Sequence, residues 1–206
     1  MAAVLFPAGI PWSKRIFDLS IAIPALTILS PLFLLISIVI MVSAGWPIFF
    51  LQARPGYHGR IFRVIKFRTM RVANASASPK SDASRLFALG RFLRANSLDE
   101  LPELINILLG EMSLVGPRPL LVQYLELYTP EQARRQNVLP GMTGWAQVNG
   151  RNILTWEEKF KHDVWYVDHW SFGLDLHILL MTVGKVIKRE GINQAESATA
   201  EEFKGK

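Results

Sequence analysis

Cysteine is absent from the 206-residue chain, which excludes disulfide bonds and thiolate metal sites. Its four histidines are scattered without the spacing of metal ligands, so we do not expect a zinc site. Negative charge is also scarce, because 23 lysines and arginines outnumber 17 aspartates and glutamates and leave a net charge of +6. Since half of the residues are hydrophobic, this balance indicates an anionic membrane surface or a phosphate-rich ligand, with nucleic acid as a third option.

Residues 1–13 have no positively charged stretch ahead of an apolar one, so we do not interpret them as a signal peptide. A long apolar run follows from Ile16 to Ala44, and Asp18 is the charged residue within it. As a helix this run would reach about 40 Å, whereas the hydrocarbon core of a bilayer is about 30 Å thick. The sequence therefore predicts a membrane helix near the N-terminus.

Three features oppose a simple crossing by this helix, and the first is Asp18, a charge near the start of the run. Pro31 lacks a backbone donor and clashes with the carbonyl of Thr27, so we expect a kink, and Ser30 can bond the freed carbonyl. Basic residues stand at both ends of the run, which favours a cytoplasmic position for both ends. A re-entrant helix that turns at Ser30 and Pro31 and an ordinary kinked spanning helix are equal alternatives on these features alone. The basic residues are Lys14 and Arg15 before the run and Arg54, Arg60, Arg63, Lys66, Arg68 and Arg71 after it.

Short β-branched and aromatic runs at residues 47–51 and 61–67 flank a turn that contains proline and glycine, which predicts a β-hairpin. In the second strand Lys66 and Arg68 would share one face, with Phe67 on the other. This basic face would either bind phosphate or be a solvated strand surface.

We expect residues 72–84, which are rich in alanine and serine, to form a mobile loop that serves as a lid or a linker. Residues 84–95 are expected to form a helix whose polar face carries Arg91 and Arg94. The apolar face of this helix would be formed by Leu86, Phe87, Leu89, Phe92 and Leu93.

Asp99 and Glu100 stand where the next helix is expected to begin. The pattern Ser97-x-x-Glu100 fits a capping box, whereas Asp99 as the cap would bring Pro102 into the first turn, where no donor is needed. Either cap leaves Asp99 in the first turn, where the helix dipole and nearby arginines favour the ionised carboxylate. An ionised aspartate can bind Mg²⁺ or attack phosphorus, so we predict Asp99 as a metal ligand and the pair as catalytic.

Arg118 lies between two prolines in the motif Gly116-Pro117-Arg118-Pro119. Because the prolines restrict the backbone, the guanidinium is presented at little ordering cost, and its planar fork suits a diphosphate. The alternative is a rigid turn that carries a surface arginine. With Arg118 we predict Lys66, Arg68 and Arg94 as the cations that bind substrate phosphates.

The glycine-rich stretch 139–152 is expected to be an extended loop. In that conformation Gln147, Asn149 and Arg151 would point to one side and could bind a sugar or a base.

Two amphipathic helices are expected to follow, one capped by Thr155 and rich in aromatic residues, the other over residues 174–188. The aromatic residues suit either the lipid interface or a buried core face, and both readings stay open. The tail after Gly191 is polar and expected to be mobile.

Several motifs occur in the order known from one family. Over residues 14–190 the chain resembles the bacterial sugar transferases, the monotopic phosphoglycosyl transferases. Within that family it looks most like the members that transfer diacetylbacillosamine phosphate to begin N-linked glycan assembly. Members that transfer a hexose phosphate to begin polysaccharide synthesis are the nearer alternative, and a non-catalytic basic scaffold on a membrane is the alternative from another class. The motifs are Lys14-Arg15-Ile16-Phe17-Asp18, Ser30-Pro31, Lys66-Phe67-Arg68-Thr69-Met70, Ser97-Leu98-Asp99-Glu100-Leu101-Pro102, Gly116-Pro117-Arg118-Pro119 and the stretch from Pro140 to Arg151.

The resemblance implies transfer of a sugar-1-phosphate from a UDP-sugar to undecaprenyl phosphate, with release of UMP. It implies that Asp99 attacks the β-phosphate to form an acyl-phosphate intermediate, with Glu100 beside it and Mg²⁺ as the cofactor. It also implies a re-entrant helix at the cytoplasmic face of the bacterial inner membrane, in contact with phospholipid. Other enzymes of glycan assembly are further candidate partners, and nucleic acid is not.

We therefore predict a mainly helical α+β fold in three parts. Residues 1–45 would form the N-terminal segment and the re-entrant membrane helix. Residues 46–190 would form one catalytic domain at the membrane interface, built from a small β-hairpin and interfacial amphipathic helices. Residues 191–206 would form a polar tail.

Overall fold

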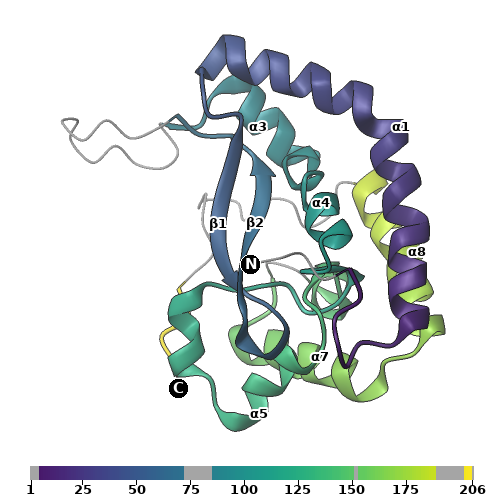
Figure 1. The fold of residues 1–206 in the computed structure, drawn as a ribbon. Helices are drawn as coiled ribbons and strands as arrows, with labels where there is room; N and C mark the ends of the chain where they lie inside the picture. Colours follow the sequence, from purple (N-terminus) through teal and green to yellow (C-terminus); the bar gives the residue numbers. More distant parts are fainter. Residues whose placement is uncertain (1–4, 72–84, 151–152, 189–201, 206) are drawn as a thin grey trace.

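A computed structural model describes residues 5–71, 85–150, 153–188 and 202–205. A long apolar helix, a β-hairpin and several shorter helices pack together (Figure 1), which confirms the predicted mainly helical α+β fold. The strands are β1 (Phe49–Pro55), β2 (Ile61–Phe67), β3 (Ser113–Val115) and β4 (Gly141–Thr143). The α-helices are α1 (Trp12–Ala44), α3 (Ala88–Ala95), α4 (Glu103–Leu108), α5 (Pro130–Ala133), α6 (Trp145–Asn149), α7 (Trp156–His169) and α8 (Phe172–Lys188). Short 3₁₀ turns lie at Tyr57–Gly59, Leu98–Glu100, Val122–Leu127 and Arg134–Asn137.

Helix α1 is the apolar run identified in the sequence, and it is long and apolar enough to cross a membrane. It contains Pro24 and Pro31, and it bends along its length (Figure 1). The carbonyl of Thr27, which loses its helical donor at Pro31, accepts a hydrogen bond of 2.8 Å from the Ser30 hydroxyl. This is the compensation expected from the sequence, and it keeps a freed backbone carbonyl satisfied on an exposed face.

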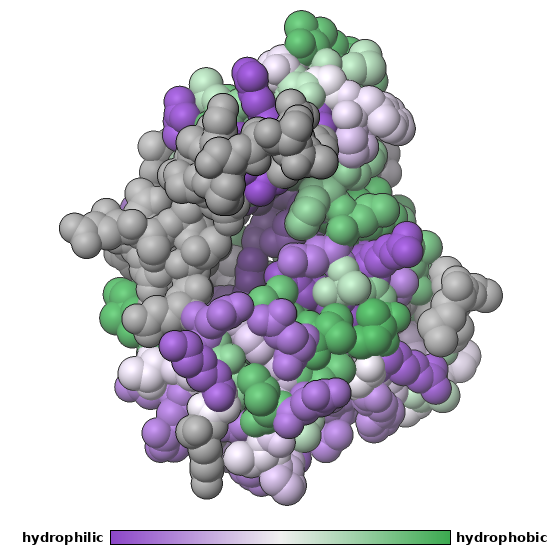
Figure 2. Space-filling view, turned by 90° about the vertical axis from the view of Figure 1, so that its left-hand side faces the viewer, coloured by the Kyte–Doolittle hydropathy of each residue, from purple (hydrophilic) through white to green (hydrophobic). Residues whose placement is uncertain are grey.

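Both ends of α1 pack against the rest of the chain. Near its beginning Ala22 is buried in the main core together with side chains of β2, α4 and α8. Near its end Ile36 and Ile40 are buried against Phe67, Phe87 and Leu93. Large apolar side chains stay exposed along the helix, and Figure 2 shows hydrophobic surface at the top of the molecule, the height at which α1 ends in Figure 1. The ends of α1 are therefore fixed to the same body of protein, while an apolar surface is left uncovered.

Lys14, one of the basic residues before the apolar run, is buried in protein. Its ammonium group donates to Asp175 at 2.6 Å and to the carbonyl of Val115 at 2.9 Å. Asp175 also accepts from the hydroxyl of Tyr166 at 2.7 Å and from the indole of Trp170 at 3.1 Å. This network joins the beginning of α1 to α7, β3 and α8.

Arg15 and Asp18 are also fully buried at the same end of α1. The Arg15 guanidinium donates to the carbonyls of Ile107 at 2.8 Å and Met112 at 3.2 Å, and lies 3.5 Å from Asp18. Asp18 accepts from the backbone N–H of Leu114 at 3.1 Å. Ser113 contributes another hydrogen bond to Asp18, at 2.9 Å. We call Lys14, Arg15, Asp18, Tyr166 and Asp175 the anchor cluster.

Strands β1 and β2 form the predicted antiparallel hairpin, with Phe49 opposite Phe67 and Pro55 opposite Ile61. The first strand begins at Phe49 and extends past the expected limit. Asn106 of α4 then binds the edge of β2, because its amide accepts from the Ile65 N–H at 3.0 Å and donates to the Arg63 carbonyl at 2.8 Å. A buried side chain therefore fixes α4 against the strand that carries Lys66.

Strands β3 and β4 pair in parallel and bring two distant motifs together. A Cβ atom at Gly141 would lie 2.0 Å from the backbone nitrogen of Gly116, and one at Gly144 would lie 2.1 Å from the Gly116 carbonyl oxygen. Side chains are excluded at this crossing, so the two glycine-containing motifs touch through their backbones. The crossing sets the path of the chain into Arg118.

Other predictions need correction. The helix expected at residues 84–95 starts only at Ala88, because Leu86 pairs with Met70 in an isolated β-bridge. The loop expected at residues 72–84 lies outside the described residues. Residues 202–205 are not a free polar tail, because Phe203 is buried among aromatic side chains.

Candidate active site

Asp99 and Glu100 lie in the 3₁₀ turn between α3 and α4. Both capping predictions are wrong, because Ser97 has a left-handed backbone with φ of 54° and its side chain caps no N–H. Helix α4 begins only at Glu103, after Pro102. The reason is that the Glu100 carboxylate is drawn to cations from elsewhere in the fold and does not turn back to the Ser97 backbone.

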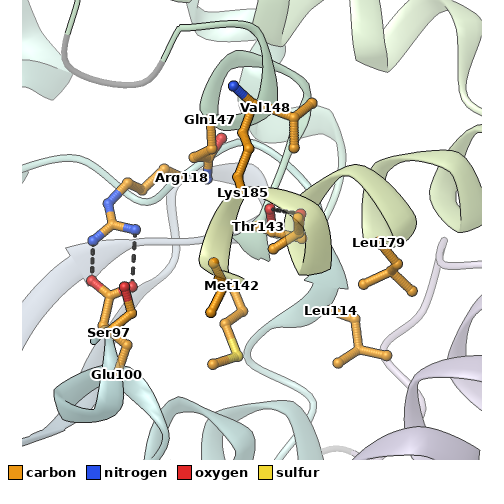
Figure 3. A pocket seen from close by; sticks show the side chains of 12 residues that line it. Ser97, Glu100, Leu114, Arg118, Met142, Thr143, Gln147, Val148, Leu179 and Lys185 are labelled. Atoms are coloured by element: carbon orange, nitrogen blue, oxygen red, sulfur yellow. Dashed lines mark hydrogen bonds and ion pairs between the residues drawn. The ribbon is translucent and has the colours of Figure 1, made fainter. Parts of the chain in front are cut away.

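Glu100 is held by two cations. Its carboxylate accepts from Lys66 at 2.7 Å and forms a two-pronged pair with Arg118, in which one contact measures 3.3 Å (Figure 3). Burial alone would raise the pKa of Glu100, but the charges of Arg118 and Lys66 outweigh burial and hold that pKa well below its usual range. Glu100 is therefore ionised throughout the neutral range and serves as the common partner of both cations.

Glu103 is a third carboxylate beside the dyad, and it is buried. Its Oε1 lies 3.1 Å from the Lys66 ammonium group. Burial, followed by the charge of Glu100, raises the pKa of Glu103. Lys66 thus stands between two carboxylates and neutralises only part of their charge.

Asp99 differs from both neighbours. Within the described part of the chain its half-buried carboxylate has no hydrogen bond and no ion pair. Burial raises the pKa of Asp99, and the charge of Glu100 adds to this, while Lys66, Arg94 and Arg118 act in the opposite direction. The carboxylate is therefore within electrostatic range of three cations but is bonded to none of them, which leaves its oxygens available to a ligand.

The other predicted cations occupy different places. Arg94 of α3 donates to the Thr69 hydroxyl at 3.0 Å and contributes positive charge near Asp99. Arg68 lies beyond the end of β2 and is buried, and its guanidinium binds the carbonyls of Ala44, Gly45 and Trp46 at the end of α1. The expected shared face of Lys66 and Arg68 is therefore wrong, because Arg68 is bound to the carbonyls where α1 ends.

A cavity of about 180 Å³ opens next to Glu100 and Arg118. Gln147 lines it, and both polar atoms of its amide are buried without a hydrogen-bond partner among the described residues. The predicted extended loop is wrong here, because residues 145–149 form α6 and alternate residues no longer share a face. Asn149 is exposed and bonds the Trp145 carbonyl at 2.8 Å, away from this cavity, and Arg151 lies outside the described residues.

The opposite wall of the cavity comes from α8, which the sequence did not connect to the site (Figure 3). Thr182 bonds the Thr143 hydroxyl at 2.7 Å and ties α8 to β4. The apolar residues of the lining are Leu114, Met142, Val148, Leu179 and Val186. The site therefore combines a charged side at the dyad with a mixed wall at α8, where Leu179 and Val186 are apolar and Lys185 adds a cation.

Comparison with known proteins places this arrangement in a family. The model of the family described as "Bacterial sugar transferase" matches residues 10–189, which includes the dyad, Arg118 and α8. The chain belongs to the bacterial sugar transferase family. This confirms the family that the sequence motifs indicated.

Three relatives show how far the similarity of this bacterial sugar transferase extends. It is 54% identical to the "Uncharacterized sugar transferase EpsL" of Bacillus subtilis, over 93% of this chain and 96% of the relative. It is 38% identical to the UDP-glucose:undecaprenyl-phosphate glucose-1-phosphate transferase of Xanthomonas campestris pv. campestris, over 85% of this chain and 39% of the relative. It is also 38% identical to the undecaprenyl-phosphate galactose phosphotransferase of Salmonella typhimurium, over 86% of this chain and 41% of the relative.

Sequence reasoning missed two buried residues of this bacterial sugar transferase that contact residues of the site. They are Arg135, which contacts Arg118, and Glu103, which contacts Lys66. Arg135 is buried, donates to the Arg118 carbonyl at 2.7 Å and pairs with Asp163 at 2.6 Å. Glu103 was visible as a third acid one turn after the dyad, but nothing in the sequence showed it to be buried. Arg135 gave no signal, since its partners are distant in sequence.

Proposed function

We propose that this bacterial sugar transferase moves a sugar-1-phosphate from a UDP-sugar to undecaprenyl phosphate and releases UMP. We further propose a hexose as the sugar and the start of polysaccharide synthesis as the step. The relatives from Xanthomonas and Salmonella, whose names specify glucose and galactose, support this alternative over the diacetylbacillosamine interpretation. The observation that carries the chemistry is the unbonded Asp99 carboxylate beside a Glu100 that is fully occupied by Lys66 and Arg118.

In the proposed first step an Asp99 oxygen attacks the β-phosphorus of the UDP-sugar. A bond forms between that oxygen and phosphorus, the bond from phosphorus to the bridging oxygen breaks, and UMP leaves with the electron pair. In the second step an oxygen of the lipid phosphate attacks the same phosphorus and displaces the Asp99 carboxylate. A carboxylate that is ionised and free of partners is suited to both steps.

Positive charge has to offset the meeting of a carboxylate with two anionic substrates. Lys66 and Arg118 are held in place by Glu100, so their unused N–H groups are pre-organised at the site before substrate arrives. Arg94 adds charge from α3. We propose that Glu100 acts chiefly by positioning these two cations, because its oxygens already accept hydrogen bonds from both.

We propose Mg²⁺ as the cofactor and Asp99 as its protein ligand. The residues described contain no cluster of three or more metal-ligating side chains, so the protein alone offers no closed metal cage. Mg²⁺ is commonly bound by one or two carboxylates together with substrate phosphates and water, and the unbonded Asp99 fits that mode. When bound there, Mg²⁺ would offset charge on the diphosphate.

The apolar side of the cavity suits the lipid end of the acceptor. Helix α8 contributes Leu179 and Val186 to the cavity and exposes Leu180 and Val183 outside it. We propose that the first isoprene units of the polyprenyl phosphate enter along this helix and bring the phosphate toward Arg118. Gln147, with its unpaired amide, is proposed to bind a polar group of the donor.

We propose that α1 is re-entrant and that the protein sits on the cytoplasmic face of the bacterial inner membrane. A spanning helix has its ends on opposite sides of the bilayer, whereas both ends of α1 are packed on one body of protein. A Leu5→Cys variant tests this, since the chain has no other cysteine. In intact cells position 5 should be protected from a membrane-impermeant maleimide and should react after permeabilisation. Strong labelling of intact cells would show a spanning helix.

The Ser30→Ala/Pro31→Ala variant provides the matched comparison. Position 31 regains a backbone donor, so the helix should straighten and a fraction of the molecules should become labelled. The buried Lys14 and Arg15 limit that fraction, because spanning would remove them from the protein interior.

The reaction is tested with the detergent-solubilised full chain, Mg²⁺, undecaprenyl phosphate and a panel of UDP-sugars, with UMP release as the readout. We expect turnover with a UDP-hexose, and about one equivalent of UMP without acceptor as the sign of a covalent intermediate. Turnover with UDP-diacetylbacillosamine alone would restore the other sugar assignment. No UMP from any donor would favour a non-catalytic scaffold.

A further inference from the structure

The C-terminal residues of the described chain bind an aromatic cage. Phe203 is only 7% exposed, and its ring lies 5.0 Å from Phe160, 5.4 Å from Trp156 and 5.6 Å from Tyr124 between ring centroids. Tyr128 completes the cage at 6.3 Å. Such contacts are the usual geometry of favourable aromatic packing.

Polar contacts fix the direction of this segment. The backbone N–H of Phe203 donates to the Tyr124 hydroxyl at 3.2 Å, and the Gln123 amide donates to the Glu202 carboxylate at 3.1 Å. A phenylalanine that enters a pocket while its backbone is hydrogen-bonded at the rim is bound in the manner of a peptide ligand. The rest of the segment is surface, because Glu202 and Lys204 are exposed.

The cage continues toward the active site. The guanidinium of Arg135 lies over the Phe160 ring, 5.8 Å from its centroid, on a path from Phe203 inward. The same guanidinium pairs with Asp163 and donates to the Arg118 carbonyl at 2.7 Å. Arg118 in turn binds Glu100 beside Asp99. Each contact in this series is direct, and the Arg135 side chain is buried, so a shift of Phe160 changes the support of Arg118.

We propose that residues 202–205 are an intramolecular ligand of the cage formed by Tyr124, Tyr128, Trp156 and Phe160, and that Phe203 is thereby a positioning residue for Arg118. Docking of the segment holds Phe160 and Arg135 in the arrangement that presents the Arg118 fork at the dyad. The positioning role of Phe203 rests on the proposed transferase function, because it is measured through activity. The docking of residues 202–205 does not depend on that function.

Docking is tested without activity. A chain that lacks residues 202–206 has an empty cage and should bind a synthetic peptide of residues 201–206, as measured by calorimetry. The full chain should not bind it, because its own segment fills the cage. The same peptide with alanine in place of Phe203 is the control and should bind neither chain. Failure of the truncated, folded chain to bind the peptide overturns the docking assignment.

Positioning is tested with the truncated chain and with full-length Phe203→Ala. Both should keep their helical circular dichroism but lose about tenfold in kcat, with a raised KM for the UDP-sugar, because Arg118 is misplaced. Saturating peptide should restore the rate of the truncated chain. Lys161→Ala, which removes one member of an exposed ion pair with Glu157 on α7, should behave like the native protein.

Arg135→Lys separates positioning from general stability. It keeps a positive charge but loses the planar contacts with Asp163 and the Arg118 carbonyl, so the full chain with Arg135→Lys should show the same kinetic change. The truncated chain with Arg135→Lys should still bind the peptide but should not regain its rate. A truncated chain that melts earlier but keeps native kcat and KM would overturn the positioning role. If the native chain releases no UMP while the truncated chain still binds the peptide, the proposed function fails and the docking stands.

Discussion

The anchor cluster and the dyad cluster, by which we mean Lys66, Asp99, Glu100, Glu103 and Arg118, are two groups of charges in one small protein. The anchor cluster is fully buried, and each of its charged side chains has an ionic partner and further hydrogen bonds. The dyad cluster is partly exposed, and within the described residues its Asp99 carboxylate has no bonded partner.

The difference shows that charged side chains with bonded partners stabilise the fold, whereas a charged side chain without a bonded partner remains available for the reaction. Burying an ion is costly unless its partners replace water, and the anchor cluster meets that condition with backbone carbonyls and N–H groups. A half-buried carboxylate that is unbonded and lies beside another negative charge destabilises the folded state. The same surroundings raise the pKa of the carboxylate, and a shifted pKa is common among functional groups. The two clusters should therefore respond oppositely to substitution.

The largest effect is expected for Asp99→Asn. The amide keeps the shape but is no nucleophile, so UMP release should fall by about three orders of magnitude or more. Because Asp99 makes no bonded contact, the melting temperature should stay unchanged or rise. Activity within tenfold of native would exclude Asp99 as the nucleophile.

Asp175→Ala should break the anchor cluster and lower stability by about 3–5 kcal/mol, because Lys14 is left buried without its counter-charge. Chemical denaturation in detergent measures this. The double variant Lys14→Met/Asp175→Leu removes both charges and should recover much of the loss. If the double variant is no more stable than Asp175→Ala, unpaired charge is not the cause.

Arg118→Lys should lower kcat by about tenfold to a hundredfold and leave stability nearly unchanged. Lysine keeps the charge but loses the two-pronged geometry toward Glu100 and phosphate oxygens. Arg134→Lys, at an exposed surface pair, is the matched control. Full activity of Arg118→Lys would mean that Arg118 acts only as a point charge.

The smallest effect is expected in the pH profile. Asp99 must be ionised to attack, and its pKa is raised, so activity should be lost as pH falls through a value above that of an ordinary aspartate. Arg94→Gln removes a cation and should move the acidic limb of kcat/KM to higher pH. Glu100→Gln removes a negative charge and should move the limb to lower pH, in addition to a lower rate. Arg91→Gln is the control and should leave the acidic limb where it is in the native protein. If Arg94→Gln and Glu100→Gln moved the limb in the same direction, the limb would not report the ionisation of Asp99.

Local patterns predicted the elements whose causes are local. The hairpin follows from strand propensity, the capped start of α7 at Thr155 from its side chain, and the Ser30 bond to Thr27 from the missing donor of Pro31. The dyad was found because two acids stand among basic residues. These features depend on neighbours within a few residues, which a single sequence displays.

Long-range contacts decided what the sequence did not predict. Arg68 was assigned to phosphate because strand alternation placed it with Lys66, but the carbonyls at the end of α1 bind it. Arg135 and Phe203 reach the site through partners far along the chain. Glycine contacts between β3 and β4, which fold the motif around Gly141 onto Gly116, likewise depend on backbone packing that no local period encodes.

The sequence separations within the anchor cluster affect how the protein is made. The carbonyls that bind Arg15 lie 92 and 97 residues downstream, and the aspartate that binds Lys14 lies 161 residues downstream, so these partners are synthesised much later. Helix α1 therefore leaves the ribosome first and meets the bilayer while its charged end is still hydrated. During that interval α1 is an apolar helix with three charged residues near its start and without the protein that later packs on it. Synthesis has to reach α8 before Lys14 gains its counter-charge, so α1 meets the bilayer before the domain is complete.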